Sequence, residues 1–460
     1  ILSVSGLHVA ILYWLVCLLL KPLDRLSAGK LLQLILGTGI IAMYVFVTGL
    51  SPPVCRAAWM IGIYQLARYL GREHQTGNAL ALTAFLLLAS NPLVLADVGF
   101  QLSFLAAAGL AGCAPLLSRH PEARSPGNHG LMARTRRWLL QQIRSMTTVS
   151  LAAQLITFPL AVYYFHQFPV YFLPANLLLI PLASLILYGG ILLLPLSATG
   201  PPAVLLVAVL EKLIDIMNLL MQFFSRLPGA VLGGIWIHPA ECAGLYLLIG
   251  CMIIFFLSRN GNWLRAALVI LVILVAASAI ESYRQDRQRR LIYFHTTQTR
   301  AVGFLAGREA VLFHEKPPDI THAAKGGPYY YSMRPFLQRS GIRRVEHHGL
   351  DENFRNRFLI KKGAWIQFFD QRLLMLDRHF SYPAMESSRG WCDLLLVTEN
   401  TYLETEKLRQ LVRIRMVVTG AEISEKLTDF LENDCGKTGT GFYSVKRSGA
   451  FLLSLNNPGR

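Results

Sequence analysis

Charged side chains are scarce in the first part of this 460-residue chain. Residues 1–280 carry only 16 Lys or Arg and 7 Asp or Glu, whereas residues 281–460 carry 28 and 20. So few charges exclude an ordinary water-soluble fold for the first part. Its composition is that of a bundle of membrane helices, and the composition of the second part is that of a soluble domain.

Three chemical motifs are also absent. None of the seven Cys forms a C-x-x-C pair, which argues against a zinc knuckle or a redox site. No H-x-H-x-D-H sequence occurs, which argues against a binuclear metallohydrolase. No G-x-x-x-x-G-K-[ST] sequence occurs, so energy from ATP would have to come from another protein. We therefore expect no cofactor, no metal and no catalytic residue.

The first residue is Ile1, which lies inside an apolar run. We expect this sequence to be a fragment with residues missing upstream. Any signal peptide would then lie outside it.

Apolar runs of about 20 residues, the length that a membrane span needs, fill residues 1–280. They predict about ten segments, at 1–20, 31–50, 53–70, 78–90, 98–117, 146–165, 171–197, 201–224, 243–257 and 264–280. Three are weak because of charge, shortness or proline, and some could be re-entrant where protein covers the backbone. We expect a polytopic α-helical membrane bundle over 1–280, a basic linker over 281–290 and a soluble α/β domain over 291–460.

Basic residues between these segments indicate the orientation. With ten crossings, the basic loops near residues 21–30, 68–72, 118–145 and 259–265 all lie on one side. The positive-inside rule makes that side cytoplasmic and places the soluble domain outside. Four arginines within 284–290 argue against this placement, and one segment that fails to cross would put the domain in the cytoplasm instead.

Polar residues at membrane depth are candidates for function, because burying them is costly unless they are paired or hydrated. The candidates along the chain are His8, Arg56, Asp97, Gln101 and Asn176. Helix-to-helix hydrogen bonding would explain any one of them equally well. Together they predict a polar path or a hydrated core.

Glu211 and Asp215 place two carboxylates on one helix face, beside Lys212. A proton or ion relay is one interpretation. An amphipathic helix at the level of the lipid headgroups is the interpretation that we favour.

Alternating apolar residues in the second part predict strands at 291–297 and 301–305. Further strand signals lie at 310–314, 365–369, 373–376, 394–398, 416–419 and 450–455. Helical patterns cover 404–412 and 424–433. This order predicts a layered α/β domain. His347 and His348 invite a metal interpretation, but neighbours on a strand point to opposite faces, so we do not favour it.

Four stretches, at residues 2–9, 51–60, 97–104 and 165–181, carry a family resemblance through their order and spacing. Together they resemble the ComEC family, the inner-membrane DNA channel of natural competence. In that family an oligonucleotide-binding barrel precedes the channel and a metallo-β-lactamase-like domain follows it. The barrel is absent here, as expected for a truncated start.

The soluble domain resembles a degenerate form of that metallo-β-lactamase-like domain. Residues 393–397 and 449–452 resemble two of its strands, but 398–401 replace its His-rich turn and 295–299 replace its Asp-rich metal approach. Hydrolase residues therefore cannot be transferred, and we expect no enzyme activity.

The resemblance implies passage of single-stranded DNA through the inner membrane into the cytoplasm during transformation. The expected path residues are Ser5, Gly6, His8, Arg56, Asp97, Gln101 and Asn176. The expected partners are single-stranded DNA, membrane lipid, a cytoplasmic ATP-driven motor and an external DNA receptor. A membrane-tethered nuclease for the second strand and a small-molecule or ion transporter using Glu211 and Asp215 are the alternatives.

Overall fold

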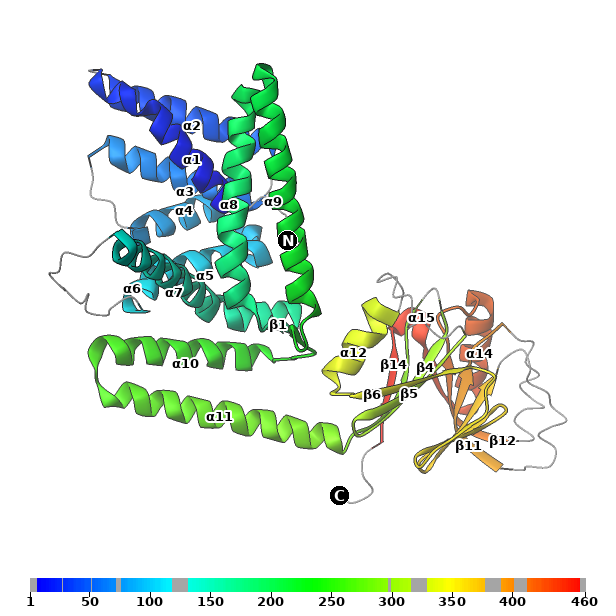
Figure 1. Ribbon diagram of the computed structural model, residues 1–460. Coiled ribbons are helices and arrows are strands. Elements are labelled where there is room, and N and C mark those ends of the chain that lie inside the picture. Colours follow the sequence, from blue (N-terminus) through cyan, green and yellow to red (C-terminus); the bar gives the residue numbers. More distant parts are fainter. Residues whose placement is uncertain are drawn as a thin grey trace. The chain divides into compact units, whose positions relative to one another are not determined.

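The computed structural model describes residues 6–26, 28–50, 52–71, 76–117, 131–296, 299–315, 329–376, 390–400 and 412–455. The chain divides into two compact units, Ile1–Leu274 and Val275–Arg460. The first is helical and the second is rich in strands (Figure 1).

Each of the ten predicted membrane segments corresponds to a helix. The helices are α1 (Gly6–Leu20), α2 (Gly29–Val47), α3 (Pro52–Tyr69), α4 (Thr76–Ser90), α5 (Val98–Gly112), α7 (Leu131–Phe165), α8 (Phe172–Leu196), α9 (Pro201–Arg226), α10 (Pro239–Ser258) and α11 (Gly261–Asp286). Short elements lie between them: η1 (Lys21–Arg25), η2 (Pro92–Ala96), α6 (Ala114–Leu117) and η3 (Ser197–Thr199). Helix α11 covers residues 281–286 of the predicted linker, and the first strand of the second unit starts at Arg289.

Six described helical segments are long and apolar enough to cross a membrane, by length and composition. They comprise α2, α5 with α6, α7, α8, α10 and α11. Helices α1 and α4 are apolar but shorter, and α9 carries three charges near its centre, at Glu211, Lys212 and Asp215. The chain is therefore a membrane protein with several candidate spans.

Close packing holds the helical unit together at a few points. Val9 of α1, Ile41 and Val45 of α2, and Val54 of α3 form one buried cluster. Helix α5 approaches α7 so closely that a Cβ at Gly109 would lie 2.8 Å from a carbonyl oxygen of α7. Small residues permit such backbone approach between membrane helices.

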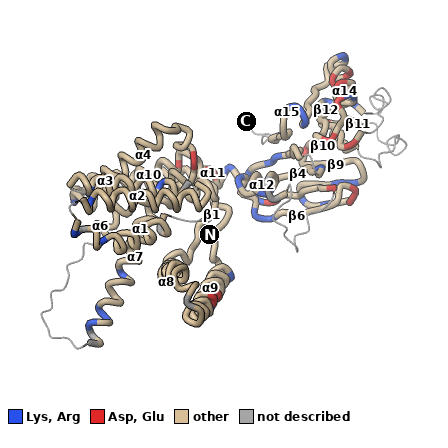
Figure 2. The backbone as a smooth tube through the Cα atoms, turned by 90° about the horizontal axis from the view of Figure 1, so that it is seen from above, with Lys and Arg blue, Asp and Glu red and all other residues tan. Residues whose placement is uncertain are grey.

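Helices α8 and α9 pack on each other and run across the direction of α1 to α5 and α10 (Figures 1 and 2). A two-stranded antiparallel ribbon pairs the segment that leads into α8 with the segment that follows α9. Strand β1 (Gln167–Pro169) precedes α8, and strand β2 (Val231–Gly233) follows α9. His166 stacks on Trp236 beside the ribbon, with ring centroids 3.4 Å apart.

The second unit contains two sheets. One has the order β14-β3-β4-β5-β6, from β3 (Arg289–Tyr293), β4 (Ala301–Ala306), β5 (Glu309–His314), β6 (Arg344–Gly349) and β14 (Phe451–Ser454). The other has the order β13-β12-β11-β10-β9-β8-β7, from β7 (Phe354–Arg355), β8 (Leu359–Lys362), β9 (Trp365–Phe368), β10 (Gln371–Leu376), β11 (Gly390–Val397), β12 (Val412–Thr419) and β13 (Gly441–Ser444). Strands β10 to β13 are mutually parallel.

The two sheets share a buried core that includes Phe304 and Phe313 of one sheet and Phe368 of the other. Helix α12 (Arg334–Arg339) covers the outer face of the five-stranded sheet through Leu337. Helix α14 (Glu425–Thr438) covers the outer face of the seven-stranded sheet through Leu431. The unit is thus layered as helix, sheet, sheet and helix, which buries both faces at the centre of each sheet.

The predicted strands are confirmed, with shifts of a few residues at their ends. The helix expected at 424–433 is α14, and β12 begins at Val412, where the other expected helix ends. Residues 404–411 of that other helix lie outside the described residues. The sequence did not indicate β6, β8, β13 or α12, and the structure adds the short α15 (Val445–Ser448) and η4 (Tyr329–Met333).

Candidate functional site

Arg56 of α3 and Asp97 at the start of α5 form an ion pair within the helical unit. The distance from Arg56 Nη1 to Asp97 Oδ1 is 3.7 Å. The Arg56 side chain is only 6% exposed, whereas that of Asp97 is 49% exposed. Arg56 Nε is buried without a hydrogen-bond partner among the described residues. The Arg56 guanidinium is therefore buried with only some of its N–H donors paired.

Asp97 is placed by the local structure of the chain. It is the N-cap of α5, and its Oδ1 accepts a hydrogen bond of 2.6 Å from the backbone N–H of Phe100. The next turn needs a small residue, because a Cβ at Gly99 would lie 3.2 Å from Asp97 Oδ1 and 3.6 Å from Arg56 Nη2. The Asp-x-Gly spacing thus allows one carboxylate both to cap α5 and to face Arg56.

Gln101 lies one turn further along α5. Its Nε2 donates to the carbonyl oxygen of Leu95 (2.8 Å), and its Oε1 accepts a 3.0 Å hydrogen bond from Tyr164 Oη of α7. These bonds link α5 to the end of α7. The polar residues of α5 therefore form a chain of contacts from α3 to α7.

The beginning of α1 lies beside this group. A Cβ at Gly6 would lie 3.5 Å from the Cβ of Ala57, the residue after Arg56. His8 lies two residues further along α1 and is half-buried. Ser5 lies outside the described residues. The structure thus brings Gly6, Arg56, Asp97 and Gln101 into one region.

The remaining predicted residues lie on other elements. Asn176 is half-buried on α8, and no described contact links it to the Arg56 pair. Glu211 and Asp215 are exposed on α9, and Asp215 pairs with Lys212 at 3.7 Å. Because the side chains of Lys212 and Asp215 are 81% and 69% exposed, this pair has the character of an amphipathic surface.

Tyr164 is the contact residue that sequence reasoning missed. The aromatic stretch around it is typical of a membrane-interface belt, and nothing local distinguishes Tyr164 from its neighbours. Only the crossing of α7 with α5 brings its hydroxyl to Gln101. The sequence alone could have indicated Tyr164 only if the neighbouring helices were known.

In the second unit, His314 and His347 are joined by a 2.9 Å contact between Nε2 and Nδ1. His348 lies on the other face of β6, where it contacts Glu352 and Phe354. The prediction that the adjacent histidines point apart is confirmed. Burial, reinforced by the charge of His347, lowers the pKa of His314 to about 4. Burial and His348 also lower the pKa of His347. This pair is therefore neutral at pH 7.

Arg300 connects the two sheets near the carboxyl ends of their strands. Its Nη2 lies 2.7 Å from Glu315 Oε1, and its Nη1 pairs with Glu399, which follows β11. Burial raises the pKa of nearby Glu422. Among the described residues, no group of three or more His, Cys, Asp or Glu could hold a metal ion.

Comparison with known proteins gives two family matches. Residues 1–260 match the model described as "Competence protein", and residues 291–455 match the model described as "ComEC C-terminal domain". The first match alone covers more than half of the chain. No solved structure matches the chain.

One curated relative is the ComE operon protein 3 of Bacillus subtilis (strain 168). It is 34% identical over 207 residues, which are 43% of this chain and 23% of the relative. The chain thus spans less than a quarter of the relative's length in this match. Both family matches agree with the helical unit and the strand-rich unit described above. The chain belongs to the ComEC family of competence proteins.

Proposed function

We propose that this protein forms an inner-membrane channel that passes single-stranded DNA into the cytoplasm during natural transformation. Membership of the competence family and the similarity to ComE operon protein 3 support DNA uptake as the process. Single-stranded DNA is then the substrate. A cytoplasmic motor and an external receptor complete the proposed set of partners.

The observation that carries the proposal is the buried Arg56 with its partly exposed partner Asp97. A DNA strand brings one negative charge per nucleotide, and a passage through lipid must compensate that charge. A guanidinium held at membrane depth by a single acid can supply such compensation, because a phosphate can replace or join the carboxylate as its partner. Gln101 and Tyr164 provide neutral hydrogen-bonding groups beside it.

The test is transformation of a naturally competent cell in which this chain carries Arg56→Gln. We expect DNA uptake to fall at least tenfold with normal protein level, because the positive charge is lost while a neutral hydrogen-bonding group remains. Lys212→Gln removes an exposed charge from α9 and is the matched control, with uptake unchanged. Normal uptake in Arg56→Gln, and also in His8, Gln101 and Asn176 variants, would contradict the channel assignment.

The basic residues between the apolar segments support a cytoplasmic location for residues 118–145, which include the first part of α7, with the strand-rich unit outside the inner membrane. Reporter fusions after residues 130, 235 and 300 test this topology. The expected locations are cytoplasmic, outside and outside. A cytoplasmic signal at residue 300 would contradict the proposed side.

The strand-rich unit, in this proposal, is a metallo-β-lactamase-like fold that has lost its hydrolase function. Its layering of helix, sheet, sheet and helix supports the fold, and the buried neutral His314–His347 pair packs against Tyr329, as a structural pair does. The test is nuclease activity of residues 285–460, assayed with Mg²⁺, Mn²⁺ and Zn²⁺. We expect none above background. Metal-dependent cleavage that a His347→Ala variant abolishes would favour the alternative of a membrane-tethered nuclease.

A further inference from the structure

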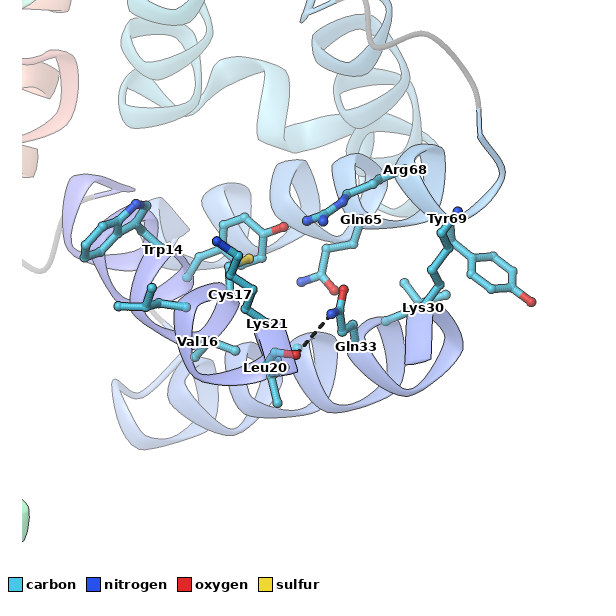
Figure 3. A pocket seen from close by; sticks show the side chains of 14 residues that line it. Trp14, Val16, Cys17, Leu20, Lys21, Lys30, Gln33, Gln65, Arg68 and Tyr69 are labelled. Atoms are coloured by element: carbon cyan, nitrogen blue, oxygen red, sulfur yellow. Dashed lines mark hydrogen bonds between the residues drawn. The ribbon is translucent and has the colours of Figure 1, made fainter. Parts of the chain in front are cut away.

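A hollow of about 380 Å³ opens between α1, η1, α2 and α3 (Figure 3). Three basic side chains line it: Lys21 from η1, Lys30 from the first turn of α2 and Arg68 from the last turn of α3. All three are exposed. None of the described residues that line the hollow is acidic. The described lining of the hollow is therefore basic.

A buried amide points into the same hollow. Gln65 of α3 is 7% exposed, and its Nε2 has no hydrogen-bond partner in the described part of the chain. Figure 3 shows its side chain directed from α3 toward α2. Gly37 of α2 leaves the room for it, because a Cβ there would lie 2.7 Å from Gln65 Oε1. A buried donor without a partner costs about 1–3 kcal/mol, so a bound acceptor would relieve this cost.

Three helix ends meet at the hollow. Helix α2 begins beside it, at Gly29, and helices α1 and α3 end beside it, at Leu20 and Tyr69. A helix dipole favours an anion at its N-terminus and a cation at its C-terminus, so the backbone adds no net positive charge here. The three cations and the buried amide, which has no partner among the described residues, describe a site for a phosphate group.

Part of the remaining lining is apolar and lies on the surface of α1. Trp14 and Leu18 of α1 line the hollow and are 57% and 51% exposed. They form an apolar wall that extends from the hollow along α1, and acyl chains can cover this wall. A nucleic-acid strand can stack a base on Trp14, but its sugars and phosphates leave aliphatic residues such as Leu18 unused. An anion that carries acyl chains can place its charged group in the basic hollow and its chains along the apolar wall.

We propose that this hollow binds the phosphate headgroup of an anionic phospholipid, with the acyl chains along Trp14 and Leu18. Basic pockets between helix ends, at the level where lipid phosphates lie, are a known arrangement for such lipids. The bound headgroup joins three helices that otherwise repel one another there through Lys21, Lys30 and Arg68. The site is separate from the Arg56 pair and does not depend on the proposed passage of DNA.

The test is native mass spectrometry of the purified full chain in detergent, titrated with phosphatidylglycerol or with phosphatidylcholine of the same acyl length. We expect phosphatidylglycerol to bind and phosphatidylcholine not to. Substitution of Lys21, Lys30 and Arg68 by Gln together should weaken binding about a hundredfold, since each cation near an anionic lipid contributes roughly fivefold. Substitution of Arg134, Arg136 and Arg137 by Gln removes the same charge from α7 and should leave binding unchanged.

A second variant tests the amide without changing charge. Gln65→Leu keeps the volume and removes the unpartnered donor, so we expect a folded protein with phosphatidylglycerol affinity about tenfold lower. Equal loss in both triple variants, or equal binding of the two lipids, would overturn the proposal. Displacement of the lipid by a single-stranded oligonucleotide at equal phosphate concentration would also overturn it and assign the hollow to DNA. Because the lipid titration contains no DNA, its failure leaves the channel proposal standing.

Discussion

Replacing Asp97 by Asn removes the charge opposite Arg56 but keeps the cap of α5, because Asn caps helices as well as Asp. Replacing Asp97 by Ala removes both the charge and the cap. The difference between the two variants therefore separates the ion pair from the hydrogen bond to Phe100 N. The same comparison in an Arg56→Met background shows which part of the cost comes from the charge left behind on Arg56.

The structure sets the expected size of each effect. Two unit charges 3.7 Å apart interact by about 1 to 4 kcal/mol between a water-like and an intermediate dielectric. Since Asp97 is half-exposed, we expect the lower part of this range, so Asp97→Asn should destabilise the fold by ~1–2 kcal/mol. Asp97→Ala should cost about 1 kcal/mol more, the usual contribution of an N-cap.

The assay is reversible unfolding of the purified full chain in mixed detergent, followed by circular dichroism. In the Arg56→Met background, we expect Asp97→Asn to have almost no effect, because the charge that needs Asp97 is gone. An unchanged cost in that background would refute the ion pair as the cause. Equal costs for Asp97→Asn and Asp97→Ala would refute the role of the cap.

Two further predictions concern the packing of α5 and the His314 pair. Gly109→Val should destabilise the helical unit by roughly 1–3 kcal/mol in the same unfolding assay, because a Cβ at Gly109 would lie 2.8 Å from the carbonyl oxygen of Ala152. The control is Gly112→Val, because a Cβ at Gly112 has nothing within 4 Å. Because the folded state keeps His314 neutral, the free energy of unfolding is not reduced by this group above about pH 6.5. It falls as the pH drops from there toward about 4, the lowered pKa of His314. His314→Gln should reduce this loss and leave the part that comes from His347, whose pKa is also lowered. The measurement is pH-corrected hydrogen-exchange protection of β5, and an identical pH slope in the variant would contradict the assignment.

Hydrophobic pattern predicted most of the fold. Strand β4 and residues 373–376 of β10 are continuous apolar runs because both faces of their sheets are covered there, so they are visible without knowledge of the topology. Strand β6 was missed because its sequence is polar. Its His347 is accommodated by pairing with His314, a contact between residues 33 positions apart that no local pattern can indicate.

The candidate site was predicted residue by residue but not as an arrangement. Polarity at membrane depth indicated Arg56, Asp97 and Gln101, and the structure joins these three through α3, α5 and α7. The same criterion selected Asn176, which lies on α8 with no described contact to the Arg56 pair, because polarity alone does not indicate which helices are adjacent. The hollow around Gln65 was not predicted, since its basic residues come from three helix ends and serve equally well as orientation signals.

The β1–β2 ribbon has a consequence for how the helical unit can be divided. Gln167 pairs with Gly233, so the chain leaves α7 and returns toward α10 at nearly the same point. Helices α7 and α10 are in direct contact, with Tyr246 Oη donating to the carbonyl oxygen of Ile156 at 3.1 Å. The α8–α9 hairpin is therefore an insertion between two points of the chain that lie close together, the end of α7 and the start of α10. A short turn in place of residues 167–237 would reconnect α7 to α10 without rerouting the other helices.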